Sequence, residues 1–173
     1  DCDWVIHLAG MNRGDDDEIY NTNIQLTSDL LANISEKTRV IFSSSTQTGS
    51  VYADSKKVCE TMLSESIGNH KTIKLPNVFG PFCKPNYNSF IATFCDKILK
   101  NEELQVNDNK VNLLYIDNLC KQIYKIASFK KIYDTKIRHD KTVSVQYIHD
   151  TLLRFKQEYL NENRIPKLKN EFE

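Results

Sequence analysis

Residues 40–56 read VIFSSSTQTGSVYADSK, and this stretch decides the fold. The apolar run Val40–Phe42 has the composition of a buried strand, and the sequence then turns abruptly polar. A helix is expected to follow after a short loop, with Tyr52 near its start. Ser45 therefore ends a strand, while Tyr52 and Lys56 lie four residues apart on one face of the helix that comes next.

Tyr52 and Lys56 have the spacing of a proton-transfer pair. A tyrosine ordinarily ionises near pH ~10, too high for a base at neutral pH. The Lys56 ammonium lies within side-chain reach and is expected to lower the pKa of Tyr52. The hydroxyl of Ser45 can hold a substrate oxygen while the proton moves. A Tyr-x-x-x-Lys match is common by chance, so its weight comes from this strand and helix context.

Strand and helix patterns alternate along the chain. Strands are expected at Trp4–Leu8, Arg39–Ser44 and Thr72–Leu75, with short candidates at Leu104–Val106 and Val111–Tyr115. Helices are expected at about 19–35, 52–66, 91–100, 117–128 and 145–159, the fourth capped by Asp117. This order predicts an α/β fold: a Rossmann-like, doubly wound parallel sheet with helices on both faces. Ligands of such sheets bind beyond the carboxyl ends of the strands.

The net charge of the chain and the spacing of its cysteines and histidines argue against several classes of function. The 173 residues carry 23 basic and 23 acidic side chains, which gives a net charge of zero. This balance argues against nucleic acid or a membrane surface as partner. The five cysteines form no Cys-x-x-Cys pair and the four histidines have no zinc-site spacing, so reduced thiols in the cytoplasm and no metal are expected.

Several motifs, taken in order, resemble the extended short-chain dehydrogenase/reductases, which act mostly on nucleotide-linked sugars. The matching segments are His7-Leu8-Ala9-Gly10, Asn23, Phe42–Ser45, Tyr52–Lys56, Leu75–Pro81 and Leu114–Asp117. The resemblance implies that Ser45, Tyr52 and Lys56 are catalytic and that the cofactor is NADP or NAD, with NADPH favoured. It further implies cofactor contacts from His7, Leu8, Ala9, Gly10, Ser43, Ser44, Tyr52, Lys56, Leu75, Asn77 and Val78.

A narrower resemblance lies in the segments 83–89 and 92–95. They are similar to bacterial capsule and O-antigen enzymes that reduce a UDP-linked 4-keto-6-deoxy amino sugar on the route to N-acetyl-L-fucosamine. This implies a UDP-linked keto sugar as substrate, with contacts from Arg13, Ser45, Asn77, Lys84, Asn86 and Asn88. The broader resemblance to the short-chain dehydrogenases/reductases also implies a homodimer formed through the Tyr52 helix.

Two parts of that subfamily are missing from the 173 residues: the glycine-rich turn that binds the cofactor pyrophosphate, and the C-terminal cupin domain. We therefore expect a segment of a longer protein, in which residues 1–80 are the second half of a dinucleotide-binding domain. Residues 81–173 are then mainly a substrate-binding part.

Other readings stay open. An epimerase or dehydratase would use the same fold, although a dehydratase would want an acid pair where Thr46 and Gln47 stand. A catalytically incomplete fragment is the alternative from a different class, because half of the cofactor site is absent.

Overall fold

Strands and helices alternate along the first part of the molecule. The computed structural model describes residues 2–128 and 136–173. It begins with β1 (Trp4–His7), α1 (Asp16–Asn33), β2 (Arg39–Ser45), α2 (Val51–Ser66) and β3 (His70–Leu75). There follow β4 (Asn77–Phe79), α3 (Phe90–Lys100), β5 (Lys110–Tyr115), α4 (Ile116–Ser128), β6 (Lys141–Ser144), α5 (Val145–Lys156) and the π-helical turn η1 (Gln157–Asn161).

Contacts within the chain define two units, and each is described by itself. The first contains residues 1–75 and 122–137, so far as they are described, and the second contains 76–121 and 138–173. Within residues 2–128 and 136–173, no helix combines the length and the apolar character needed to cross a membrane.

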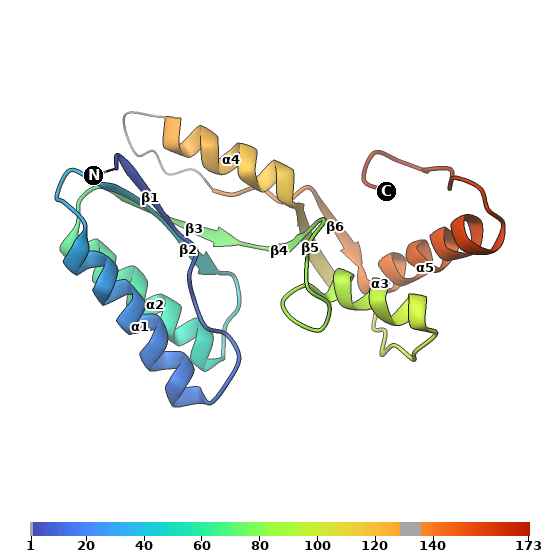
Figure 1. Ribbon diagram of the computed structural model, residues 1–173, viewed down its shortest axis with the longest axis horizontal. Helices are drawn as coiled ribbons and strands as arrows, with labels where there is room; N and C mark the ends of the chain where they lie inside the picture. Colours follow the sequence, from blue (N-terminus) through green and yellow to red (C-terminus); the bar gives the residue numbers. More distant parts are fainter. Residues whose placement is uncertain (1, 129–135) are drawn as a thin grey trace. The chain divides into compact units, whose positions relative to one another are not determined.

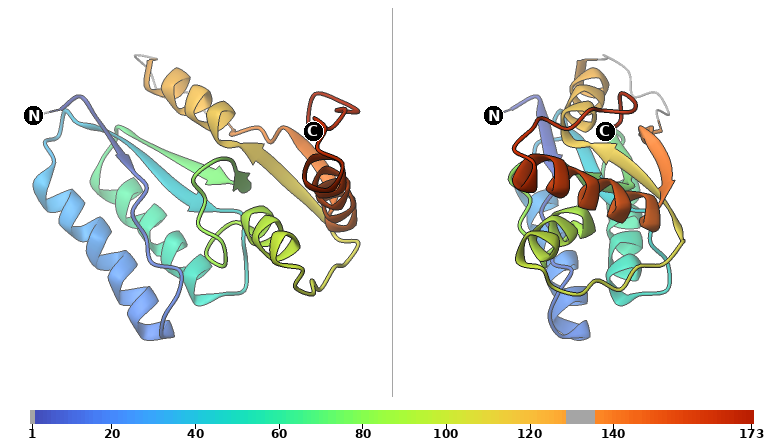
Figure 2. Two further views of the ribbon diagram at one scale, coloured as in Figure 1. Left: turned by 45° about the vertical axis from the view of Figure 1, so that its right-hand side comes forward. Right: turned by 90° about the vertical axis from the view of Figure 1, so that its right-hand side faces the viewer.

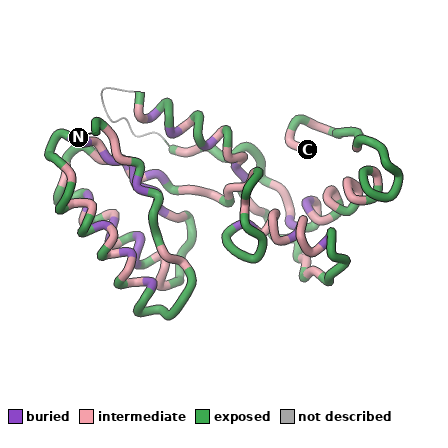
Figure 3. The backbone as a smooth tube through the Cα atoms, in the orientation of Figure 1, coloured by how far each residue is buried: buried purple, intermediate pink, exposed green. Residues whose placement is uncertain are grey.

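The first unit is built on a parallel sheet in the order β1-β2-β3, with Val5 opposite Val40 and Phe42 opposite Thr72. Helices α1 and α2 lie side by side against this sheet (Figure 1). The central strand β2 is buried along most of its length (Figure 3). Since side chains alternate across a strand, Val40 and Phe42 face the same way and pack with Cys59 of α2.

The helix starts follow from local sequence. The side chain of Asp15 accepts a hydrogen bond from Asp17 N at 3.0 Å, and three acidic residues stand in the first turn of α1, where they suit the helix dipole. Ser50 caps α2 in the same way, accepting from Ala53 N at 3.2 Å. The cap fixes where α2 begins, and so places Tyr52 in its first turn.

The second unit has a mixed sheet, in the order β4-β5-β6. Strand β4 runs parallel to β5, and β6 runs antiparallel to it. Helices α3 and α5 pack together beside this sheet (Figure 2), around a core of Phe94, Ile98 and Val145. The core buries large apolar side chains, each worth roughly 1.5–3 kcal/mol when fully removed from water.

The alternating fold and the parallel sheet are confirmed, but several details of the sequence prediction are wrong. Leu104–Val106 forms no strand; Leu104 and Val106 instead pack against the core of the second unit. Asp117 lies inside the first turn of α4 and does not precede it. Strands β4 and β6 were not predicted, because they have three and four residues and show too little alternation to be detected.

Candidate active site

Tyr52 and Lys56 lie on α2 of the first unit, one helical turn apart. Lys56 is only 3% exposed. Its ammonium lies 4.5 Å from the centroid of the Phe42 ring and 5.9 Å from that of the Tyr52 ring. Both distances lie within the range of a cation–π interaction. The Lys56 ammonium therefore lies close both to Phe42 of the central strand and to Tyr52.

The three serines at the end of β2 have different partners. Ser43 donates to the carbonyl oxygen of His7 at 3.2 Å, which links β2 to β1. Ser44 donates to the Glu60 carboxylate on α2. Ser45 accepts a hydrogen bond from Gln47 N at 3.0 Å, in the loop that leads to α2. Its oxygen is thereby oriented at the carboxyl end of the strand, where ligands of parallel sheets bind.

Asn23 ties three segments of the first unit together. Its side-chain amide donates to Met11 O at 2.8 Å and to Ser55 Oγ at 2.9 Å, and its Oδ1 accepts from Met11 N at 2.7 Å. Ser55 in turn donates to the carbonyl oxygen of Tyr52 at 2.8 Å. Asn23 is buried, so these bonds fix the loop after β1 against the helix that carries Tyr52.

Gly10 leaves room beside the buried ammonium. A Cβ atom at this position would lie 3.1 Å from Lys56 Nζ and 3.3 Å from Asn23 Oδ1. The loop after β1 therefore approaches Lys56 closely only because residue 10 has no side chain. A glycine loop beside a buried ammonium fits the ribose of a nicotinamide cofactor. The glycine-rich turn that would bind the pyrophosphate does not occur in these 173 residues.

Burial sets the protonation states of the site. Burial raises the pKa of Tyr52 above its ordinary value of 10.0 and lowers that of Lys56 below 10.5. Burial, helped by the charge of Lys56, also lowers the pKa of His7 below 6.5. The sequence analysis expected Lys56 to lower the pKa of Tyr52; in the structure desolvation of the phenol instead raises that pKa. Tyr52 is therefore held as a phenol, the form that donates a proton.

The other predicted residues divide between the units. His7, Leu8, Ala9, Gly10, Arg13, Ser43, Ser44, Ser45, Tyr52, Lys56 and Leu75 belong to the first unit. Asn77, Val78, Lys84, Asn86 and Asn88 belong to the second, on β4 and the loop after it. In that loop Lys84 Nζ lies 5.8 Å from the centroid of the Tyr87 ring, and Asn86 N donates to Thr93 Oγ1 at 2.9 Å.

Sequence analysis missed Ser55 and Glu60 as parts of this site. Glu60 is four residues after Lys56, so Tyr52, Lys56 and Glu60 share a helix face, and that spacing could have drawn attention to it. Its bond to Ser44 joins α2 to the strand that ends in Ser45. Asn23, which donates to Ser55, lies 32 residues away in the sequence, and no local pattern reveals this partner.

A Tyr-x-x-x-Lys helix packed on a parallel sheet, with a serine ending the central strand, is the arrangement on which the resemblance to the short-chain dehydrogenases/reductases rests. The chain is 34% identical over 156 residues to the UDP-2-acetamido-2,6-beta-L-arabino-hexul-4-ose reductase of Pseudomonas aeruginosa, covering 83% of this chain and 40% of that protein. Its structure resembles the capsular polysaccharide assembling protein CapF from Staphylococcus aureus, with a TM-score of 0.72 and 35% identity, over 99% of this chain and 49% of CapF. Over most of its own length the chain thus resembles members of the family of NAD-dependent epimerases and reductases.

More distant structures share the fold alone. Bordetella bronchiseptica WbmG, solved in complex with NAD, has a TM-score of 0.74 at 16% identity, over 97% of this chain and 59% of WbmG. Thermotoga maritima UDP-glucose 4-epimerase, solved with UDP-glucose, has a TM-score of 0.76 at 19% identity, over 98% and 65%. No family model matches the chain. The chain spans less than half the length of the reductase and of CapF.

Proposed function

We propose that this chain carries the catalytic residues of an NAD(P)H-dependent reductase. Its substrate would be a UDP-linked 4-keto-6-deoxy-N-acetyl amino sugar, an intermediate in making N-acetyl-L-fucosamine for capsule or O-antigen. The observation that carries the proposal is the buried Lys56 ammonium, held between the rings of Tyr52 and Phe42 at the strand that ends in Ser45. Similarity to a reductase of a UDP-linked hexulose supports the substrate class.

Tyr52 is the proposed general acid. A reduction at a carbonyl needs a proton for the forming alkoxide, and a phenol with a raised pKa remains protonated at neutral pH. Ser45 would hydrogen-bond the same oxygen and hold it in place. General acid catalysis of this kind accelerates a reaction about 10²–10⁴-fold.

Lys56 and the loop around Gly10 are proposed to hold the nicotinamide ribose. When bound, a reduced nicotinamide supplies a hydride to the carbonyl carbon. The proposed contacts to the cofactor come from the ends of β1, β2 and β3 and from β4: His7, Leu8, Ala9, Gly10, Ser43, Ser44, Leu75, Asn77 and Val78. NADPH is the proposed form of the cofactor.

Substrate recognition is proposed for Arg13 and Ser45 of the first unit and for Asn77, Lys84, Asn86 and Asn88 of the second. Residues 1–80 would then supply mainly the cofactor site, and residues 81–173 mainly the sugar site. The basic and amide side chains of this set suit a diphosphate and sugar hydroxyls. We also propose a cytoplasmic homodimer that pairs through α2.

The second candidate is a catalytically incomplete fragment of the same family. An epimerase acting on another nucleotide sugar stays open as a third, since epimerases share this fold at low identity.

Nicotinamide fluorescence separates these candidates. NADPH and then NADH are titrated into this chain and into a chimera in which the N-terminal part of CapF precedes Asp1. Binding by the chimera, with turnover of the UDP-linked keto sugar, supports the reductase. Binding by the chimera without turnover of that sugar favours an epimerase or an incomplete site, and binding by neither contradicts the reductase proposal.

A further inference from the structure

The second unit contains a cavity of about 770 Å³ that includes none of the predicted catalytic or substrate residues. We call it the tail cavity, because Leu168 and residues 170–173 line it. Part of its lining is aromatic: the Phe79 ring centroid lies 5.5 Å from that of Tyr115 and 5.9 Å from that of Phe172. Its volume falls within the range of small-molecule sites, about 300–1,000 Å³.

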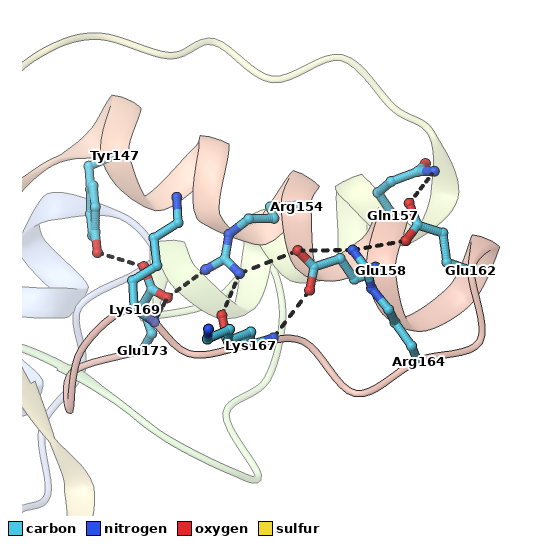
Figure 4. A network of polar contacts seen from close by, with 9 residues as sticks. All are labelled: Tyr147, Arg154, Gln157, Glu158, Glu162, Arg164, Lys167, Lys169 and Glu173. Carbon is cyan, nitrogen blue, oxygen red and sulfur yellow. Dashed lines mark hydrogen bonds and ion pairs between the residues drawn. The ribbon is translucent and has the colours of Figure 1, made fainter.

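A network of polar contacts, shown in Figure 4, holds the tail (residues 168–173) in place. Glu173, whose side chain is 1% exposed, forms an ion pair with Arg154 and accepts hydrogen bonds from Tyr147 Oη at 2.9 Å and Lys169 N at 2.8 Å. Asn170 Nδ2 also donates to Tyr147 Oη, at 3.2 Å. These bonds position Phe172 against Phe79, so the aromatic part of the lining is a fixed part of the second unit.

Polar side chains also line the cavity. Asp140 accepts from Tyr115 N at 2.7 Å and from Asn118 Nδ2 at 3.0 Å, which holds the side chains of Asp140 and Asn118 in place. The ammonium of Lys141 lies 5.9 Å from the centroid of the Phe172 ring. Carboxylate oxygens have further lone pairs, and an ammonium has three donors, so these side chains offer both acceptors and donors to a ligand.

The charges exclude two kinds of ligand. Arg154 balances the charge of Glu173, so the carboxylates of Asp140 and Glu171 outnumber the single ammonium of Lys141 in the lining, and this excess repels a phosphate. An organic cation would compete with Lys141 for the Phe172 ring, and Glu173 already has Arg154 as its counter-ion. A neutral ligand with hydroxyl groups and one apolar face carries no charge for this lining to repel.

We propose that the tail cavity binds a neutral sugar ring. The C–H face of the ring packs on Phe79 and Phe172, whose π faces carry partial negative charge. Its hydroxyl groups bond to Asn118, Asp140 and Lys141. The same ring could come from a free glycan or from a nucleotide-linked sugar, and the charges place any diphosphate outside the cavity.

The test follows backbone amide resonances of ¹⁵N-labelled chain during titration. The probes are triacetylchitotriose, maltotriose, UDP-N-acetylglucosamine and UDP. We expect saturable shifts at Asn118, Asp140 and Phe172 with at least one neutral trisaccharide, at a Kd of about 1 mM or below. Tighter binding of UDP-N-acetylglucosamine than of the trisaccharides would identify a nucleotide-linked ring as the source, and the reverse would identify a free glycan.

Variants separate the cavity from the rest of the unit. Phe172→Ala should abolish the shifts, and Lys141→Gln, which leaves the tail network intact, should weaken binding about fivefold. Tyr159→Ala is the matched control: it removes an exposed aromatic ring that lines a different cavity of the same unit, and binding should not change. Shifts at these amides with UDP alone, no saturable shifts with any probe, or unchanged binding by Lys141→Gln and Phe172→Ala would overturn the proposal.

Discussion

The side-chain amide of Asn23 on α1 lies 2.9 Å from the hydroxyl of Ser55 on α2 and donates a hydrogen bond to it. The Ser55 hydroxyl in turn donates a hydrogen bond to the carbonyl oxygen of Tyr52. The same asparagine bonds both backbone groups of Met11. One buried side chain thus sets the distance between the loop that follows β1 and the helix that carries the proposed general acid.

Asn23→Ala should lower the free energy of unfolding by about 2–3 kcal/mol, because it leaves the polar groups of Met11 and Ser55 without their buried partner. Urea denaturation measures the change. Asn33→Ala on the same helix is the control, since its amide bonds Asp29 O at an exposed position. Its effect should stay within about 0.5 kcal/mol. Equal losses in the two variants would contradict the role given to Asn23.

Gly10→Ala should impair the cofactor site rather than the fold. The new Cβ would meet Lys56 Nζ at 3.1 Å, so the ammonium must move by a few tenths of an ångström. We expect kcat/KM of the chimera with CapF to fall about tenfold, since misplacement of catalytic groups is costly. Gly68→Ala, where nothing lies within 4 Å of the new Cβ, is the matched variant and should retain full activity.

Lys56→Met should stabilise the chain while it removes the proposed activity. Burial lowers the pKa of Lys56, which means that the charged amine costs folding free energy at neutral pH. The free energy of unfolding should rise by about 1 kcal/mol, and the gain should shrink as the pH approaches 10.5. Lys57→Met, at an exposed position of the same helix, controls for the side chain. A loss of stability in Lys56→Met would show that the contact with the Phe42 ring outweighs desolvation.

The Glu173 network should make stability depend on acid pH. Burial opposes ionisation, but hydrogen bonds from Lys169 N, Tyr147 and Arg154 hold the pKa of Glu173 below 4.5. The contribution is therefore present above pH 4.5 and is lost as the pH falls through the lower, folded pKa.

Glu173→Gln should lower the free energy of unfolding at pH 7 by about 1–3 kcal/mol, with the difference vanishing in strong acid. Thermal melts at a series of pH values measure it. Glu171→Gln, at an exposed position in the same tail, should show no such dependence. A constant difference between Glu173→Gln and the unchanged chain at all pH values would refute the assignment.

Local sequence was sufficient to predict a helix or strand where one hydrophobic or spacing pattern dominates the segment. The run Val40–Phe42 fills the central strand, and the spacing of Tyr52 and Lys56 is a property of α2 alone. The strand β2 extends one residue further than expected, to Ser45, and the helix starts at Val51 because Ser50 caps it. The strand and the helix depend on neighbours within a few residues, which is why they could be predicted to within one residue at these ends.

Tertiary contacts account for what was missed. Asn77–Phe79 is a strand only because it pairs with Leu113–Tyr115, and Leu104 packs into a core instead of a sheet. The raised pKa of Tyr52 comes from burial, which the spacing of Lys56 does not reveal. The hydrogen bond from Ser44 to Glu60 joins residues 16 positions apart, and the bond from Arg154 to Glu173 joins residues 19 positions apart. Local sequence reveals neither contact.

The most direct test of the central claim is single-turnover reduction of the UDP-linked 4-keto sugar by the chimera with CapF, comparing Tyr52→Phe with the unchanged protein. Tyr124→Phe, at an exposed position, serves as the control. If Tyr52 is the general acid, its variant should bind NADPH normally and turn over about 10²–10⁴ times more slowly. Turnover at the unchanged rate in Tyr52→Phe would contradict the account.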